Sequence, residues 1–221
     1  HKTPRRQRQM CIRDRYPENN EISFSSLALV PFGHIYSLLS KLRMSKAVKK
    51  QFDIPIVCIG NLNAGGTGKT PTTISAAQFL RDRKYNVHIV SRGYGGNAMG
   101  PLSVNDQQHS ANDVGDEALM LSAFAPTWVA SNRSDGIQSA IKEGADIVLL
   151  DDGFQDPSVY KDLSILTVNA KKGFGNNRCI PAGPLREKLR NGLERADVLI
   201  SIGTETSQKT FKSIYKSYIN M

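Results

Sequence analysis

Apolar and polar residues alternate along this chain in a pattern of short buried strands and amphipathic helices. A continuous apolar run at 54–59 is typical of a buried strand, and residues 70–80 follow with helical spacing, with Pro71 tolerated in the first helical turn. Further strands are predicted at 86–91, 127–130, 146–151, 163–168 and 197–201, and further helices near 116–124, 134–143 and 185–196. This alternation predicts an α/β fold with three α/β/α layers around a mostly parallel sheet.

A glycine-rich turn joins the first strand to its helix. Its sequence from Gly60 to Pro71 is GNLNAGGTGKTP, which includes Gly65, Gly66, Thr67, Gly68, Lys69 and Thr70. Glycines allow successive main-chain N–H groups to converge on phosphate oxygens, and the helix N-terminus adds its positive end. Lys69 can bridge the outer phosphates and Thr70 can ligate Mg²⁺. The turn predicts a P-loop NTPase-like fold that binds a nucleoside triphosphate.

One position departs from the general pattern of such loops. The pattern has a glycine five residues before Gly68, where this chain has Asn63. Asparagine tolerates positive φ better than other non-glycine residues, so we expect Asn63 to preserve the turn in that way. Ala64 stands where one neighbouring class of P-loop ATPases carries an extra lysine, which argues against that class.

A predicted buried strand at 146–151 ends in a pair of acids, Asp151 and Asp152, followed by Gly153. In a parallel sheet this carboxyl end lies beside the phosphate loop, where an acid can hold Mg²⁺ directly or through water. The simpler alternative is a strand that ends in an Asp-Gly turn. The Gly-Lys-Thr sequence upstream favours the magnesium interpretation.

Three other segments carry candidate chemistry. The loop 91–96 contains Arg92, which could supply charge to a substrate or simply belong to a tight turn. Asp116 opens a predicted helix, either as its N-cap or as a general base. The long glycine- and proline-rich loop 173–187 is more typical of a site wall than of a connector, and it carries Arg178, Arg186 and Glu187.

The net charge of +9 is concentrated at one end of the chain. The first fifteen residues hold Lys2, Arg5, Arg6, Arg8, Arg13 and Arg15 against a single acid. We expect 1–15 to be a disordered or foreign basic segment, and without interleaved aromatics it is weak support for nucleic-acid binding. Three cysteines without a C-x-x-C pair favour a reducing compartment, and four scattered histidines show no zinc spacing.

Residues 27–40 form an apolar stretch that is followed by basic residues up to Lys50. The stretch is shorter than the about 20 apolar residues that a bilayer-spanning helix needs. A helix lying in the membrane interface, next to anionic lipid, fits this composition, and so does a helix packed on the protein's own core. We therefore divide the chain into 1–15, an interfacial helix and basic linker at 16–50, a core at 51–205, and 206–221, which we expect to begin a further domain.

Taken in order, five motifs resemble the tetraacyldisaccharide 4'-kinase family, the P-loop kinases of lipid A synthesis. They are Gly60-Asn61 with Gly65 to Pro71, then 91–96 (SRGYGG), 115–117 (GDE), 151–155 (DDGFQ) and 181–187 (PAGPLRE). The resemblance runs from about Leu27 to Ser201. It favours the interfacial helix at 16–50, because the family acts on a membrane-embedded glycolipid.

The resemblance implies transfer of the ATP γ-phosphoryl group to the 4'-hydroxyl of a tetraacyldisaccharide 1-phosphate, a lipid A precursor, at the cytoplasmic face of the inner membrane. It implies that Lys69 stabilises the transferring group, that Thr70 with Asp151 or Asp152 serves Mg²⁺, and that Asp116 is the catalytic base. Arg133 and Glu187 match positions near the nucleotide or substrate. Such chemistry depends chiefly on positioning and charge stabilisation.

Two departures from the family matter. Asp156 stands where many relatives have a histidine after the DDGFQ motif. The family also has a C-terminal domain with an Asp-His-His motif, whose histidine partners the catalytic aspartate, and this sequence contains no such motif. We therefore expect these residues to bind nucleotide but to catalyse poorly.

Two other function classes compete with the kinase. A P-loop GTPase or ATPase switch would act through conformational change, but the guanine-reading motif Asn-Lys-x-Asp is missing from the sequence. A nucleotide-independent binding module for membranes or nucleic acid would depend on the basic segments alone. Nucleotide binding separates these classes.

Overall fold

The structure is a computed structural model that describes residues 27–219, so the predicted basic segment 1–15 lies outside the described residues. The chain forms two compact units that alternate along the sequence. Residues 47–61 and 68–167 make one, the sheet unit; of the described residues, 27–46, 62–67 and 168–219 make the other, the second unit. The segments predicted from the sequence, 16–50, 51–205 and 206–221, stay a prediction.

The sheet unit is built on parallel strands. They are β1 (Ile56–Gly60), β2 (Val87–Ser91), β4 (Thr127–Val129), β5 (Ile147–Asp151) and β6 (Leu163–Asn169), the last of which ends in the second unit. The strand order is β3-β4-β2-β5-β1-β6, and the short edge strand β3 (Leu102–Ser103), which the sequence pattern did not predict, pairs antiparallel with β4. The register places Ile59 opposite Asp151, so β1 and β5 end side by side.

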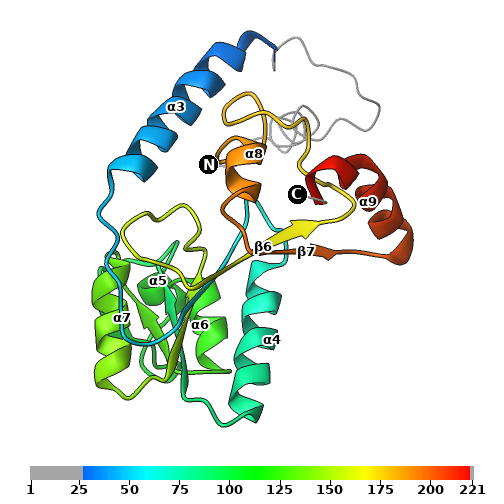
Figure 1. Cartoon of the computed structure of the whole chain (residues 1–221). Helices are drawn as coiled ribbons and strands as arrows, with labels where there is room; N and C mark the ends of the chain where they lie inside the picture. The colour runs from blue at the N-terminus through cyan, green and yellow to red at the C-terminus, as the bar shows by residue number, and fades with distance from the viewer. Residues whose placement is uncertain (1–26, 220–221) are drawn as a thin grey trace, which may run out of the picture. The chain divides into compact units, whose positions relative to one another are not determined.

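Helices cover both faces of this sheet, as the alternating pattern predicted (Figure 1). On one face, Ala77 of α4 (Lys69–Asp82) and Leu121 of α6 (Asp116–Ser122) belong to one apolar cluster with Ile89. On the other face, Gly136 of α7 (Arg133–Lys142) approaches Val90 so closely that an added Cβ would lie 2.9 Å from its side chain. Because successive strand residues point to opposite faces, Ile89 and Val90 mark two helical layers. The three-layer α/β/α fold is confirmed. A short helix, α5 (Ala111–Val114), precedes α6.

The second unit contains three helices and a strand among its described residues: α3 (Val30–Lys46), α8 (Leu189–Leu193), β7 (Val198–Ile202) and α9 (Glu205–Ile219). β7 lies beside the end of β6, where the Ala170 N–H donates to the Ile202 carbonyl at 2.8 Å. α3 begins within the predicted apolar stretch 27–40 and continues into the basic residues as far as Lys46. α8 is shorter than the helix predicted at 185–196, because Leu185 instead forms β-bridges with Asn63 and Cys179.

Candidate active site

The phosphate loop has the backbone conformation that its glycines permit. Gly68 is the N-cap of α4 with φ +91°, and Gly65 has φ +133°. A Cβ added to Gly65 or to Gly66 would meet no atom within 4 Å, so space is open beside these main-chain groups. Open space beside glycine amides fits the polyphosphate that the sequence predicts here.

The prediction for Asn63 was wrong in its mechanism, because Asn63 is absent from the non-glycine residues with positive φ in the described chain. Its main chain instead forms a β-bridge with Leu185, and its Nδ2 donates to the Gly173 carbonyl at 3.0 Å. Asn63 therefore holds its turn through contacts with a distant loop, which a scan of local φ preferences could not reveal.

Gly60, which ends β1, is required by packing. A Cβ at this position would lie 2.5 Å from Cβ of Phe154. The next residue, Asn61, accepts a hydrogen bond through its carbonyl from Gln155 Nε2 at 2.9 Å. The Gly60-Asn61 pair and the Phe154-Gln155 pair therefore fit against each other, which gives a physical reason for their joint presence in the sequence.

Lys69 lies beside the acid pair at the end of β5. Its Nζ is 3.5 Å from Oδ1 of Asp152, and only 9% of the Lys69 side chain is exposed. Thr73, one turn further along α4, donates to Oδ1 of Asp151 at 3.3 Å. Thr70, on the same helix, is half-buried. The sheet unit therefore brings Lys69 and Thr73 to Asp151 and Asp152 at the end of β5, while the predicted role of Thr70 stays a prediction.

Asp151 is a buried carboxylate with unused hydrogen-bonding capacity. It is 1% exposed, and its Oδ2 has no hydrogen-bond partner among residues 27–219. Burial raises the pKa of Asp151 to about 6, and the charges of Glu117 and Asp152 act in the same direction. Lys69 and the hydrogen bond from Thr73 only partly oppose this shift.

Asp151 Oδ2 is buried without a hydrogen-bond partner among the described residues, next to a second acid, Asp152, and to the hydroxyl of Thr73. Carboxylate and hydroxyl oxygens are ligands that Mg²⁺ prefers. The residues present therefore fit a magnesium ion. A site made only of side chains is not expected here, and the described part of the chain has no group of three or more His, Cys, Asp or Glu residues arranged to hold a metal. Mg²⁺ at phosphate sites usually has only one or two carboxylate ligands and takes the remainder from phosphate and water.

Asp152 adopts a left-handed backbone conformation, with φ +52°. Its main-chain carbonyl accepts a hydrogen bond from Nη2 of Arg133 at 2.8 Å. Nη1 of the same arginine donates to Oδ2 of Asp156 at 3.0 Å. Arg133 is 5% exposed, and both terminal nitrogens bind protein groups. Its predicted contact with the nucleotide stays a prediction.

Asp116 occupies the first turn of α6, and Gly115, not Asp116, is the N-cap. The N-cap alternative for Asp116 was therefore wrong. Asp116 and Glu117 are both exposed, which leaves their carboxylates available to a substrate. Glu117 was not among the predicted site residues, although its charge raises the pKa of Asp151. Its position beside Asp116 in the GDE motif was the available signal.

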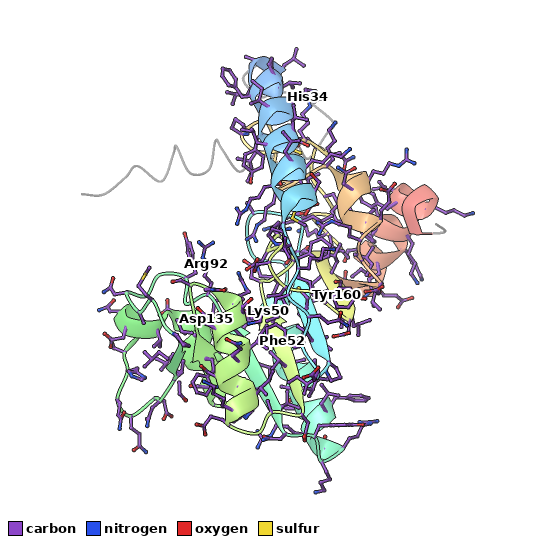
Figure 2. All side chains as sticks on the ribbon, turned by 60° about the vertical axis from the view of Figure 1, so that its left-hand side comes forward. His34, Lys50, Phe52, Arg92, Asp135 and Tyr160 are labelled. Atoms are coloured by element: carbon purple, nitrogen blue, oxygen red, sulfur yellow. The ribbon has the colours of Figure 1, made fainter. Side chains whose placement is uncertain are left out.

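Arg92 is exposed on the loop that follows β2, and Figure 2 shows it at the surface of the sheet unit. Glu187 belongs to the second unit, where it is 7% exposed and pairs with Arg195, with 2.6 Å between Oε2 and Nη2. Arg186 donates its main-chain N–H to the Leu62 carbonyl at 2.7 Å. The predicted role of Glu187 near the nucleotide or substrate stays a prediction.

The family model for tetraacyldisaccharide-1-P 4'-kinase (LpxK) matches residues 25–220. The chain belongs to this family. Tetraacyldisaccharide 4'-kinase of Jannaschia sp. (strain CCS1) is 49% identical over 195 residues, and that of Dinoroseobacter shibae is 47% identical over 194. Each alignment covers 88% of this chain, and the chain spans 60% and 58% of the two relatives.

A solved LpxK from Aquifex aeolicus, crystallised in complex with ATP, has a similar fold. The TM-score is 0.75 at 30% identity, over 84% of this chain and 61% of the LpxK chain. This similarity confirms the P-loop NTPase-like fold class of this LpxK family member. No helix within residues 27–219 is long and apolar enough to cross a membrane.

Proposed function

We propose that this chain contributes the nucleotide-binding part of an ATP- and Mg²⁺-dependent kinase that phosphorylates the 4'-hydroxyl of a tetraacyldisaccharide 1-phosphate in lipid A biosynthesis. The observation that carries the proposal is the cluster at the ends of β1 and β5. There Lys69 lies 3.5 Å from Asp152, next to the buried and unpartnered Oδ2 of Asp151. The proposed acceptor, a tetraacyldisaccharide 1-phosphate, is taken from the family to which the chain belongs.

Each residue of the cluster has a role that its position supports. The amides of Gly65, Gly66, Thr67 and Gly68 hold the polyphosphate, and Lys69 neutralises charge on the transferring phosphoryl group. Thr70, Asp151 and Asp152 hold magnesium, which reduces the charge of the phosphates when bound.

The acceptor hydroxyl needs a base as its oxygen bonds to phosphorus. Asp116 is the proposed base, because its carboxylate is exposed at the start of α6. It takes the proton of the 4'-hydroxyl while the bond between the γ-phosphorus and the bridging oxygen breaks, and ADP leaves with that electron pair.

The proposed location is the cytoplasmic surface of the inner membrane, where the lipid A precursor is the acceptor. α3 exposes large apolar side chains along its length: Phe32, Ile35, Leu38, Leu39 and Leu42. Lys41 and Arg43 are exposed on the same helix. Exposed apolar and basic side chains on one helix suit an interface of acyl chains and anionic headgroups. The proposed partners are this lipid precursor and the membrane surface, and not nucleic acid.

Replacing Lys69 tests the proposal. Lys69→Ala removes the ammonium group from the phosphate site, so the affinity for ATP should fall at least tenfold while Lys142→Ala, an exposed lysine at the end of α7, leaves it unchanged. Equilibrium binding of a fluorescent ATP analogue measures both. Equal affinity for ATP in the wild type and in Lys69→Ala would refute the proposed kinase function.

A further inference from the structure

Asp156 directly follows the DDGFQ motif and takes part in a connected set of polar contacts. Its Oδ1 accepts hydrogen bonds from the Ser158 N–H at 2.9 Å and from the Ser158 hydroxyl at 2.6 Å. Its Oδ2 binds Nη1 of Arg133 at 3.0 Å. Each carboxylate oxygen of Asp156 therefore has its own partner.

The turn that carries Asp156 is itself fixed. The Asp156 N–H donates to the Gly153 carbonyl at 3.0 Å, and Lys161 Nζ donates to the Asp156 carbonyl. The Lys50 N–H donates to the Ser158 carbonyl at 2.9 Å, which attaches the turn to the segment before β1. Figure 2 shows Lys50 next to Phe52 in this region, consistent with the 5.3 Å between Lys50 Nζ and the Phe52 ring centroid.

Arg133 transmits this support to the acid pair. While Asp156 holds one terminal nitrogen of the guanidinium, the other binds the Asp152 carbonyl at 2.8 Å. That carbonyl belongs to a residue with φ +52°, a conformation that non-glycine residues avoid unless surrounding contacts enforce it. Gly153, the next residue, leaves no room for a side chain, since an added Cβ would lie 2.9 Å from Leu150 Cβ.

We propose that Asp156 is a positioning residue, which fixes Arg133 so that the guanidinium holds the Asp152 peptide in its left-handed conformation and aims the Asp152 carboxylate at the Lys69 and magnesium site. Asp156 itself touches neither nucleotide nor metal. Its effect passes through Arg133 and the main chain of Asp152. The inference depends on the proposed function, because magnesium and ATP are the groups that the Asp152 carboxylate serves.

Asp156→Asn tests the proposal, because it retains an oxygen acceptor for Ser158 but removes the charge that holds Arg133. Supporting residues behind metal ligands commonly alter metal affinity by 10–100-fold, so the Mg²⁺ concentration at half-maximal ATP binding should rise about tenfold. The affinity for ATP without metal should change less than about twofold, since the P-loop amides and Lys69 are untouched. Thermal melting of each variant gives stability separately.

Asp162→Asn is the matched control, because Asp162 also accepts a hydrogen bond in the sheet unit, from the Ile56 N–H at 2.8 Å, but has no bond to Arg133. It should leave the Mg²⁺ midpoint unchanged. Ser158→Ala removes only the hydroxyl that donates to Asp156 Oδ1, and it should move the Mg²⁺ midpoint in the same direction as Asp156→Asn. If Asp156→Asn does not fold, Ser158→Ala provides the test of the positioning role.

The outcomes separate the two proposals. If the wild type shows no Mg²⁺-dependent ATP binding, the proposed function fails. If the wild type shows it and neither Asp156→Asn nor Ser158→Ala moves the midpoint, Asp156 is merely structural and the positioning role is overturned, even where the melting temperature falls. A shift in the midpoint with Asp162→Asn as well would also overturn it.

Discussion

Asp151 is a residue whose burial lowers the stability of the folded chain. A buried carboxylate oxygen without a hydrogen-bond partner costs free energy in the folded chain, and here it lies where a cation would compensate for it. Binding sites commonly lower the stability of the folded protein, because their strain or desolvation is relieved only when the ligand binds.

Asp151→Asn should therefore gain stability relative to the wild type as pH rises. Because burial raises the pKa of Asp151 to about 6, from a usual 3.8, the folded chain binds more protons than the unfolded chain between these values. The stabilisation that the protonated Asp151 carboxyl gives to the folded chain is fully present below about pH 4 and is lost as pH rises through 6. The difference in free energy of unfolding, variant minus wild type, should increase by roughly 2 kcal/mol from pH 4 to 8.

Urea unfolding at the two pH values measures this difference, with Asp146→Asn, an exposed acid before β5, as the control. The same Asp151→Asn variant should lose the Mg²⁺ dependence of ATP binding. A difference that stays constant with pH would show that Asp151 ionises at an ordinary pH.

At the scale of elements, a glycine between α5 and α6 fixes where α6 begins. Gly115, the N-cap of α6, has φ +87°, and a Cβ there would lie 2.5 Å from the Tyr94 carbonyl oxygen. Gly95 has the same φ, but a Cβ there would meet nothing within 4 Å. A substitution at Gly95 would introduce conformational strain alone, whereas one at Gly115 would add a steric clash to the same strain.

Gly115→Ala should lower the free energy of unfolding by about 3 kcal/mol, because strain and overlap add, whereas Gly95→Ala should cost about 1 kcal/mol from strain alone. Chemical denaturation of both variants provides the measurement. Equal costs would mean that the close approach of Tyr94 to Gly115 does not constrain the start of α6, where Asp116 lies.

α3 is the element proposed to meet the membrane. Replacing Phe32 and Leu39, each 61% exposed, by serine should reduce partitioning onto anionic vesicles by at least about a hundredfold, since each buried apolar side chain contributes roughly 1.5–3 kcal/mol and every 1.4 kcal/mol is tenfold. Phe79→Ser, at a 55% exposed position on α4, is the control and should have no effect. Vesicle co-sedimentation measures the partition. Unchanged partitioning of the α3 variant would contradict the proposal that α3 binds the membrane.

At the scale of the whole molecule, nucleotide binding should appear as stability. A ligand at 100 times its dissociation constant stabilises the folded chain by about 2.7 kcal/mol, which corresponds to roughly 5–10 °C in melting temperature for a chain of this size. We expect this shift with Mg²⁺ and ATP for the wild type and for Lys142→Ala, and about half of it or less for Lys69→Ala, whose affinity for ATP should be at least tenfold lower. Calorimetry measures it. An equal shift with GTP, or with Lys69→Ala, would favour a different nucleotide function.

By itself, the sequence was sufficient to predict the parallel α/β architecture, the glycine-rich loop between β1 and α4, and the acid pair at the end of β5. Each of these depends on neighbours along the chain: apolar periodicity, glycines before a helix, carboxylates after a buried run. Residues such as Lys69 and Asp151 could be named because a parallel sheet gathers its strand ends at one edge.

Only the tertiary structure decided what depends on residues far apart in the sequence. Arg133 joins Asp156 to the Asp152 peptide, Asn63 bonds to Gly173 rather than using a positive φ, and α8 is shortened by the pairing of Leu185. Desolvation of Asp151 likewise follows from packing on all sides. Periodicity records which face of an element is buried, whereas the partner of a buried polar group is fixed by which distant segment packs against it.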